Sequence, residues 1–163
     1  MIQKLKLVRS RLLVLLTHSI ALPVLKVIRR KKVFSYSIEQ LSALPYETVG
    51  NELWQSLNEN NLRLLPYYEK HDIKHVVLQY PFTDEGEVCL QFFMLANGRI
   101  SFPVLITVIF GLLTMPEYYS SFKTAYRKGK LAADLQNLDW FSIIELPLCV
   151  VQEQIQNNSH FKR

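Results

Sequence analysis

The spacing of apolar positions along the chain is that of packed helices. Val49, Leu53 and Leu57 recur at four-residue intervals, which places them on one face of an α-helix. No segment alternates apolar and polar positions in the manner of paired strands. The predicted fold class is therefore all-α, a single-domain compact multi-helix bundle with an N-terminal basic–apolar helix. The remaining predicted helices cover residues 37–44, 68–79, 85–95, 102–115, 116–128 and 147–155, with a short helical stretch up to residue 135.

Capping and helix-breaking residues set the predicted helix ends. Thr48 and Asp84 precede helical segments and are expected N-caps, because their side-chain oxygens can accept the first unpaired backbone N–H groups. Gly129 is expected to end the helix that starts near residue 116, since glycine is unfavourable within helices. Asp139 is expected to cap a turn over residues 140–144, and Pro147 to open the last helix.

Two segments, residues 12–25 and 102–115, are apolar on nearly every side. The first has bases on both flanks and is interrupted by Pro23. As a helix it would span about 21 Å, at roughly 1.5 Å per residue, which is less than the roughly 30 Å of a bilayer's hydrocarbon core. It predicts a helix lying on a membrane surface, or one whose apolar face closes the core. The second segment is either a central core helix or part of a lipid-facing wall.

The positive charge belongs to the N-terminus. The net charge is +5, yet residues 1–33 hold nine Lys or Arg and no acid, while the rest of the chain holds ten bases and fourteen acids. The expected partner is therefore a membrane surface and not nucleic acid. This divides the chain into a membrane-surface helix (1–33), a helical domain (34–156) and a loose tail (157–163). Cys89 and Cys149 are expected to be buried thiols in a reducing compartment.

The residues that indicate chemistry are His71, Asp72 and His75, followed by Glu87. On a helix, the two histidines lie about 40° apart and Asp72 about 100° from His71, so the three side chains share one arc. The turn after this helix can bring the next one back antiparallel and aim Glu87 at the same point. Two imidazoles and two carboxylates suit Zn²⁺ best, with Fe²⁺ or Mn²⁺ as alternatives.

Each of these residues also has an ordinary structural explanation. Glu87 follows Asp84 by three positions, where the glutamate of a capping box lies. Asp72 can simply favour the start of a helix, and the two histidines can be surface residues one turn apart. From the spacing alone, the metal site and these alternatives both remain open.

The motif H-D-x-x-H, then eleven residues, then E resembles the signature of the Coq-four family of ubiquinone (coenzyme Q) biosynthesis proteins. It is present in full as His71, Asp72, His75 and Glu87. The resemblance extends over about residues 48–155 and includes the segments 68–70, 126–129 and 139–140. One departure is Gln79, which stands before Tyr80 where the family usually has glycine.

The resemblance implies a membrane-associated, metal-dependent protein of quinone biosynthesis. Its expected activity is oxidative decarboxylation of a polyprenyl hydroxybenzoate, in which a hydroxyl replaces the carboxyl at ring carbon one. The motif residues would hold the metal and carry the chemistry, with Asp72 or Glu87 able to shuttle a proton. The alternative is a non-catalytic scaffold that binds an isoprenoid lipid and organises other quinone-biosynthesis proteins. A metal hydrolase is a third class, but an Asp in place of the Glu of H-E-x-x-H disfavours a protease.

The expected partners follow from this substrate. A prenyl tail needs an apolar groove, for which residues 102–115 and the N-terminal helix are the candidate walls. Arg127, Lys128 and Lys130 could receive an anionic lipid head group, or could simply complement the end of their helix. The expected location is the cytoplasmic face of a bacterial inner membrane, or the matrix side of a mitochondrial one, and a homodimer is possible.

Overall fold

The all-α prediction is confirmed. The structure is a computed structural model that describes residues 9, 11–12 and 34–157, so the predicted helix over residues 1–33 lies almost wholly outside the described residues, as does the tail from residue 158. The described part contains no strand, only an isolated bridge between Thr48 and Pro147. Its helices are α3 (Ile38–Ser42), α4 (Val49–Glu59), α5 (Glu69–Val77), α6 (Asp84–Ala96), α7 (Phe102–Thr114), the short 3-10 helix η2 (Pro116–Tyr118), α8 (Tyr119–Leu131) and α9 (Leu148–Gln156).

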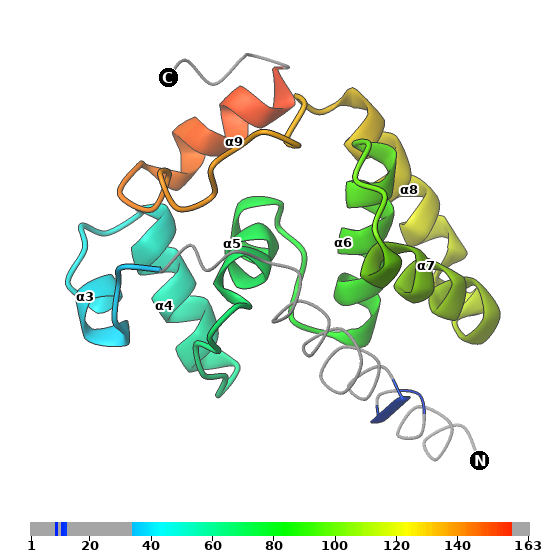
Figure 1. Ribbon diagram of the computed structural model, residues 1–163, viewed down its shortest axis with the longest axis horizontal. Coiled ribbons are helices and arrows are strands. Elements are labelled where there is room, and N and C mark those ends of the chain that lie inside the picture. The colour runs from blue at the N-terminus through cyan, green and yellow to red at the C-terminus, as the bar shows by residue number, and fades with distance from the viewer. Residues whose placement is uncertain (1–8, 10, 13–33, 158–163) are drawn as a thin grey trace.

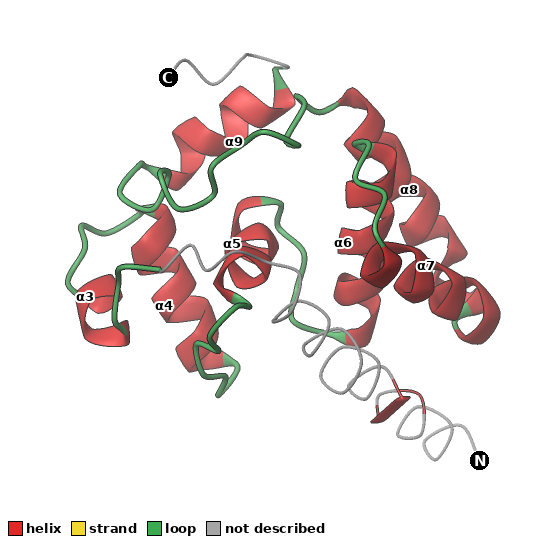
Figure 2. Ribbon diagram, in the orientation of Figure 1, coloured by secondary structure: helices red, strands yellow, loops and turns green. Residues whose placement is uncertain are grey.

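The helices form an arch with α5 at its centre (Figures 1 and 2). One end holds α3 and α4, the other holds α6, α7 and α8, and α9 crosses above α5. α5 packs against α4 on one side and α6 on the other, while α6 packs against both α7 and α8. This places the α5 and α6 side chains that face each other near the middle of the molecule.

Burial of apolar side chains on both sides of α6 holds the arch together. One core cluster includes Leu53 of α4, Ile73 of α5 and Leu90 of α6, all fully buried. A second cluster joins α6 to α7 and α8, where Phe92 stacks on Phe122 with ring centroids 4.9 Å apart. Burying each such side chain stabilises the fold by about 1.5–3 kcal/mol. α6 is therefore a shared wall between two cores and has little freedom to shift.

The predicted helix starts are right in part. Thr48 caps α4, since its hydroxyl accepts the Asn51 N–H at 3.3 Å, and α9 begins directly after Pro147 as expected. Asp84 is not a cap: Thr83 accepts the Gly86 N–H at 3.1 Å, and Asp84 is the first helical residue. Both residues are good caps, so the sequence alone could not choose between them.

Gly129 does not end the helix, contrary to prediction. α8 continues to Leu131, and a β-carbon at Gly129 would collide with the Phe93 carbonyl oxygen of α6. The glycine therefore permits close packing of two helices. The predicted helical stretch to residue 135 is also wrong, since residues 132–135 are not helical. The Asn97 amide donates to the carbonyls of Gly129 and Ala133 at 3.1 and 2.9 Å and holds this segment against the end of α6.

The predictions for the two cysteines and for Asp139 are confirmed in part. Cys89 is buried but Cys149 is exposed, because it lies on the outer side of α9. Asp139 does cap a turn, accepting the Phe141 N–H at 3.3 Å.

In the described part of the chain no single helix is long and apolar enough to span a membrane; α7 and η2–α8 pass that test only as a pair, which is bent by 103°.

Candidate metal centre

The facing sides of α5 and α6 bring His71, His75 and Glu87 together. His71 Nε2 lies 3.0 Å from Glu87 Oε1, and His75 Nε2 lies 3.0 Å from Glu87 Oε2. One ligand atom of each residue lies within 4.8 Å of the others. The antiparallel return of α6 expected from the sequence is what makes this arrangement, with both imidazoles meeting a single carboxylate.

The backbone fixes the orientation of His75. Its side chain is 1% exposed, and its Nδ1 lies 3.0 Å from the Tyr80 carbonyl oxygen. Because a carbonyl oxygen only accepts, Nδ1 must carry the proton and donate it, and Nε2 is then the atom directed at Glu87. The Phe82 ring stacks on the imidazole at 4.6 Å and covers it. A metal-binding histidine is ordinarily held by a bond of this kind.

Asp72 lies beside the cluster of three but not within it. Its Oδ1 is 3.5 Å from His71 Nδ1, and that nitrogen is buried without a hydrogen-bond partner. A cation held at Nε2 would place the imidazole proton on Nδ1, which then faces the Asp72 carboxylate. Three of the four predicted residues thus converge, while the fourth is positioned to orient one of them.

The charges of the cluster suit a cation. Burial disfavours the charged form of His71, but the Glu87 and Asp72 carboxylates outweigh this and raise the pKa of His71 to about 9. Burial likewise acts to raise the pKa of Glu87, yet the two histidines hold it well below its usual value. Glu87 is therefore ionised, and in the absence of metal it faces a protonated His71. A divalent metal bound there would replace the His71 Nε2 proton, so this donor set fits Zn²⁺, Fe²⁺ or Mn²⁺.

Gln91 is a polar neighbour that the sequence analysis missed. Its Nε2 donates to Glu87 Oε1 at 3.1 Å, and the residue is 8% exposed. The spacing of four positions from Glu87 on the same helix was the available signal. This bond holds the Glu87 carboxylate in the orientation that meets both histidines.

Replacing Gln91 with leucine is expected to weaken metal binding by roughly 10- to 100-fold, as loss of an outer partner of a metal ligand commonly does. The measurement is competition with a chromophoric chelator for Zn²⁺. Gln152→Leu is the control, since Gln152 lies on α9 and accepts a hydrogen bond from Gln79 at 3.3 Å, outside the cluster. Equal affinities for Gln91→Leu and the unmodified chain would contradict the role assigned to Gln91.

Gln79 occupies an unusual backbone conformation at the end of α5. Its φ is +59°, in the left-handed region that glycine adopts without strain. This explains why a glycine suits the position, and why glutamine there costs free energy. The turn is kept by the contacts that follow it, among them the Tyr80 N–H to His75 carbonyl bond of 3.0 Å.

Gln79→Gly is accordingly expected to raise the free energy of unfolding by about 0.5–1 kcal/mol, the relief of left-handed strain less the larger chain entropy of glycine. Urea denaturation followed by circular dichroism measures it. Lys70→Gly, within helical α5, should instead lower stability. A loss of stability in Gln79→Gly would show that the Gln79 side chain outweighs the strain.

Two pockets adjoin the α5–α6 turn, and Tyr80 and Lys128 line both. One, of about 380 Å³, lies between the turn and α8 and includes Glu85, Cys89 and Thr124. The other, of about 340 Å³, includes Val77, Phe93, Leu131 and Ile155. Of the three bases predicted to receive a head group, Lys128 is the one that lines these pockets; Lys130 lies over the Tyr126 ring at 5.2 Å and Arg127 is exposed on α8.

Fold and site together define a class: an all-α protein with a candidate metal centre of two histidines and a glutamate between neighbouring helices. Residues 64–158 match the family described as coenzyme Q (ubiquinone) biosynthesis protein Coq4. The matched region is more than half of the chain and contains the whole cluster. The chain belongs to this family, which places it in ubiquinone biosynthesis.

The fold is also found in a solved structure. A protein of Nostoc punctiforme PCC 73102, provisionally assigned to ubiquinone biosynthesis, matches with a TM-score of 0.62 and 22% sequence identity. The match covers 93% of this chain and 82% of the Nostoc chain. None of the curated proteins compared with this chain matches it. At this identity the Nostoc structure supports the fold alone.

Proposed function

We propose that this protein is a metal-dependent enzyme of ubiquinone biosynthesis that replaces the ring carboxyl of a polyprenyl hydroxybenzoate with a hydroxyl. The observation that carries the proposal is the His71–His75–Glu87 cluster within a Coq4-family chain. The site offers three ligands, and the His71 and Glu87 side chains are 27% and 15% exposed. Three protein ligands leave a coordination position for substrate, which is the arrangement of catalytic metal centres.

Some residues of the site would bind the metal, and others would orient the metal ligands or the substrate. His71, His75 and Glu87 would hold a divalent cation, which when bound supplies Lewis-acid or redox chemistry at the ring. The Tyr80 carbonyl fixes the His75 tautomer, and Asp72 can take the His71 Nδ1 proton. Tyr68 stands edge-on to His71, with ring centroids 5.6 Å apart. Burial, followed by the Glu87 and Asp72 charges, raises the pKa of Tyr68 to about 12, so its phenol keeps a proton that it can donate toward a bound substrate.

The stoichiometry of replacing the carboxyl with a hydroxyl determines which co-substrates the reaction needs. The bond between the ring and the carboxyl breaks, carbon dioxide leaves, and a bond between the ring carbon and oxygen forms. With dioxygen as oxidant, one oxygen atom enters the ring hydroxyl. The other is reduced to water by two electrons and two protons from an external donor. A productive assay therefore needs air and a reductant as well as the metal.

The tail of such a substrate suggests where the protein works. A long prenyl chain keeps the substrate in a bilayer, so the enzyme must reach a membrane surface. The basic N-terminal segment supplies charge for this, and the pocket lined by Val77, Phe93 and Leu131 supplies apolar surface near the site. We place the protein peripherally on the cytoplasmic face of a bacterial inner membrane, together with other quinone-biosynthesis proteins.

The test is purification, metal analysis and incubation with a prenylated hydroxybenzoate in detergent micelles, under air with ascorbate. Mass spectrometry should show loss of the carboxyl and gain of a hydroxyl, and His75→Ala should abolish the conversion. His71→Ala tests the second imidazole, and Cys149→Ala, at an exposed residue of α9, is the control. If the protein bound metal and lipid but did not convert the substrate, the result would favour the non-catalytic scaffold over the enzyme.

A further inference from the structure

One face of α7 is apolar and exposed. Its large side chains recur at helical spacing along that face, whereas the opposite face is buried by Val104, Val108 and Gly111. Gly111 lies so close to Val88 of α6 that a β-carbon would collide with it, which fixes which side of α7 faces the core. The exposed members are Phe102 at 57%, Leu105 at 39%, Ile109 at 54%, Leu112 at 43% and Leu113 at 77% exposed; we call them the α7 face.

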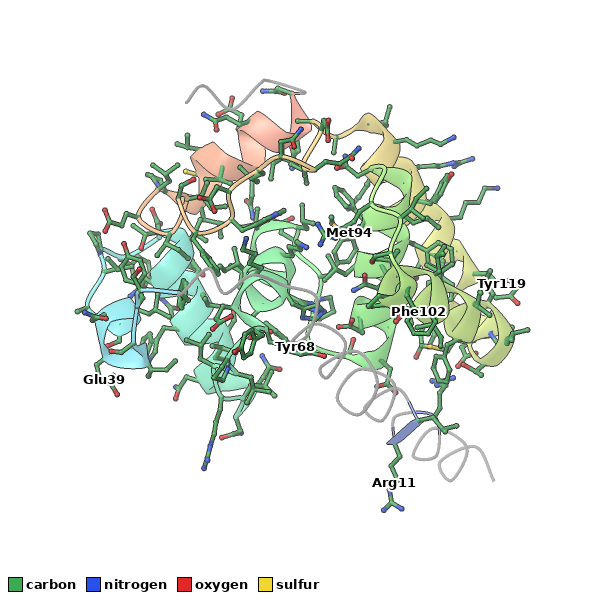
Figure 3. All side chains as sticks on the ribbon, in the orientation of Figure 1. Arg11, Glu39, Tyr68, Met94, Phe102 and Tyr119 are labelled. Carbon is green, nitrogen blue, oxygen red and sulfur yellow. The ribbon has the colours of Figure 1, made fainter. Side chains whose placement is uncertain are left out.

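The α7 face is uniformly apolar. α7 carries no charged residue along its whole length, and its neighbours within the described part of the chain are chiefly α6 on the buried side and η2 at its end. Figure 3 shows Phe102 and Tyr119 at the α7–α8 end of the molecule, away from α3. A contiguous apolar surface of this kind on a folded domain marks a site of association.

The charge of the adjoining helix indicates the chemistry of the partner. α8 exposes Lys123, Arg127, Lys128 and Lys130, and no acid lies between Glu117 and Asp134. This is a local excess of positive charge within a domain that is otherwise mildly acidic. Apolar side chains next to unbalanced bases match the boundary of an anionic bilayer, where acyl chains lie beneath phosphate groups.

Glu117, the acid at the end of α7, is paired with a base. Arg9 donates to the Glu117 carboxylate at 2.6 Å and to the Thr114 carbonyl at 3.3 Å, and its guanidinium lies over the Tyr118 ring. The Arg9 end of the basic N-terminal segment is therefore fastened to the end of α7.

We propose that the α7 face inserts into the head-group boundary of an anionic lipid bilayer, with α7 lying in the membrane plane and the bases of α8 facing lipid phosphates. This rests on the proposed membrane association and names the surface that makes it. At roughly 1.5 Å per residue, α7 is about 20 Å long, too short to cross a bilayer, and the 103° bend before α8 prevents the pair from continuing as one span. A second copy of the chain is the less suitable occupant, because a face-to-face contact would set the bases of one α8 near those of the other.

Flotation of the full chain with vesicles tests this. The protein is expected to bind mixed phosphatidylcholine–phosphatidylglycerol vesicles much more tightly than pure phosphatidylcholine vesicles. Ile109→Glu and Leu113→Glu should each weaken binding at least about tenfold, since each removes a large apolar side chain from lipid contact. Leu62→Glu, at an apolar residue of the α4–α5 connector that is 43% exposed, as Leu112 of the α7 face is, should leave binding unchanged. Lys123→Gln combined with Arg127→Gln should remove the preference for anionic lipid.

Three outcomes would overturn the proposal. The first is unchanged vesicle binding in both α7 variants. The second is equal weakening by Leu62→Glu. The third is a dimer, seen by sedimentation equilibrium, that Ile109→Glu dissociates, because the face would then bind a second copy. Turnover of prenylated hydroxybenzoate in detergent micelles is measured in parallel. Its absence in the unmodified chain would refute the enzyme while leaving the vesicle result standing.

Discussion

Glu87→Gln is expected to lower the affinity for Zn²⁺ by at least about a hundredfold, more than the loss of an outer partner such as Gln91. The Glu87 carboxylate is the group on which both imidazoles converge, at 3.0 Å each. An amide of the same shape keeps the packing but removes the negative charge. The measurement is metal content after purification, followed by titration against a competing chelator. Glu85→Gln, two positions earlier on α6 and outside the cluster, is the control and should bind metal normally.

The same variant separates metal binding from electrostatic stability. In the metal-free protein, burial acts to lower the pKa of His71, but the Glu87 and Asp72 carboxylates outweigh it and raise this pKa to about 9, against an ordinary value of 6.5. The protonated histidine thus stabilises the fold fully below about pH 6.5, and this stabilisation is lost as the pH rises through 9. Metal-free protein should therefore unfold at lower urea concentration at pH 9 than at pH 6.5, and Glu87→Gln should reduce that difference. A Glu87→Gln protein that kept both its metal and its pH dependence would show that the cluster is not the site.

The sequence was informative about the site because the relevant geometry is local. His71 and His75 are one helical turn apart on a single helix. The connection from α5 to α6 is short, so α6 must run back beside α5. Their convergence with Glu87 could therefore be predicted from spacing. Asp72 shares the same arc, yet the structure places it against His71 Nδ1 at 3.5 Å. Which carboxylate reaches the centre of the cluster depends on the distance between the axes of α5 and α6. That distance cannot be read from the spacing of residues along the sequence.

Features that depend on contacts between distant segments could not be predicted. Gly129 has the sequence pattern of a helix terminator, and only the closeness of Phe93 of α6 shows that it is a packing residue. The segment after it needs Asn97, more than thirty positions earlier, to satisfy its carbonyls. Residues 102–115 were predicted to be either core or lipid-facing wall. Because α7 packs chiefly on α6, one of its faces is buried and the other is exposed.

Gly86 is the position where the fold and the site meet. It is the residue before Glu87, and a β-carbon there would collide with the carbonyl oxygen of Pro81, with the carbonyl carbon and ring of the same proline close behind. The obstacle is backbone, which cannot rotate away as a side chain can. The crowded turn also carries the Tyr80 carbonyl that accepts the His75 Nδ1 proton at 3.0 Å. Relief of the collision must move this turn, the start of α6, or both.

Gly86→Ala is therefore expected to lower the free energy of unfolding by about 3 kcal/mol, at the upper end of overpacking costs, and to weaken Zn²⁺ binding in the molecules that remain folded. Gly129→Ala is the matched control. It meets the Phe93 carbonyl in the same way but lies on α8, away from the cluster. It should lose comparable stability while keeping its metal affinity. Urea denaturation and chelator competition on both variants separate the two effects. Equal loss of affinity in both would mean that general destabilisation, and not the Pro81–Gly86 turn, controls the metal site.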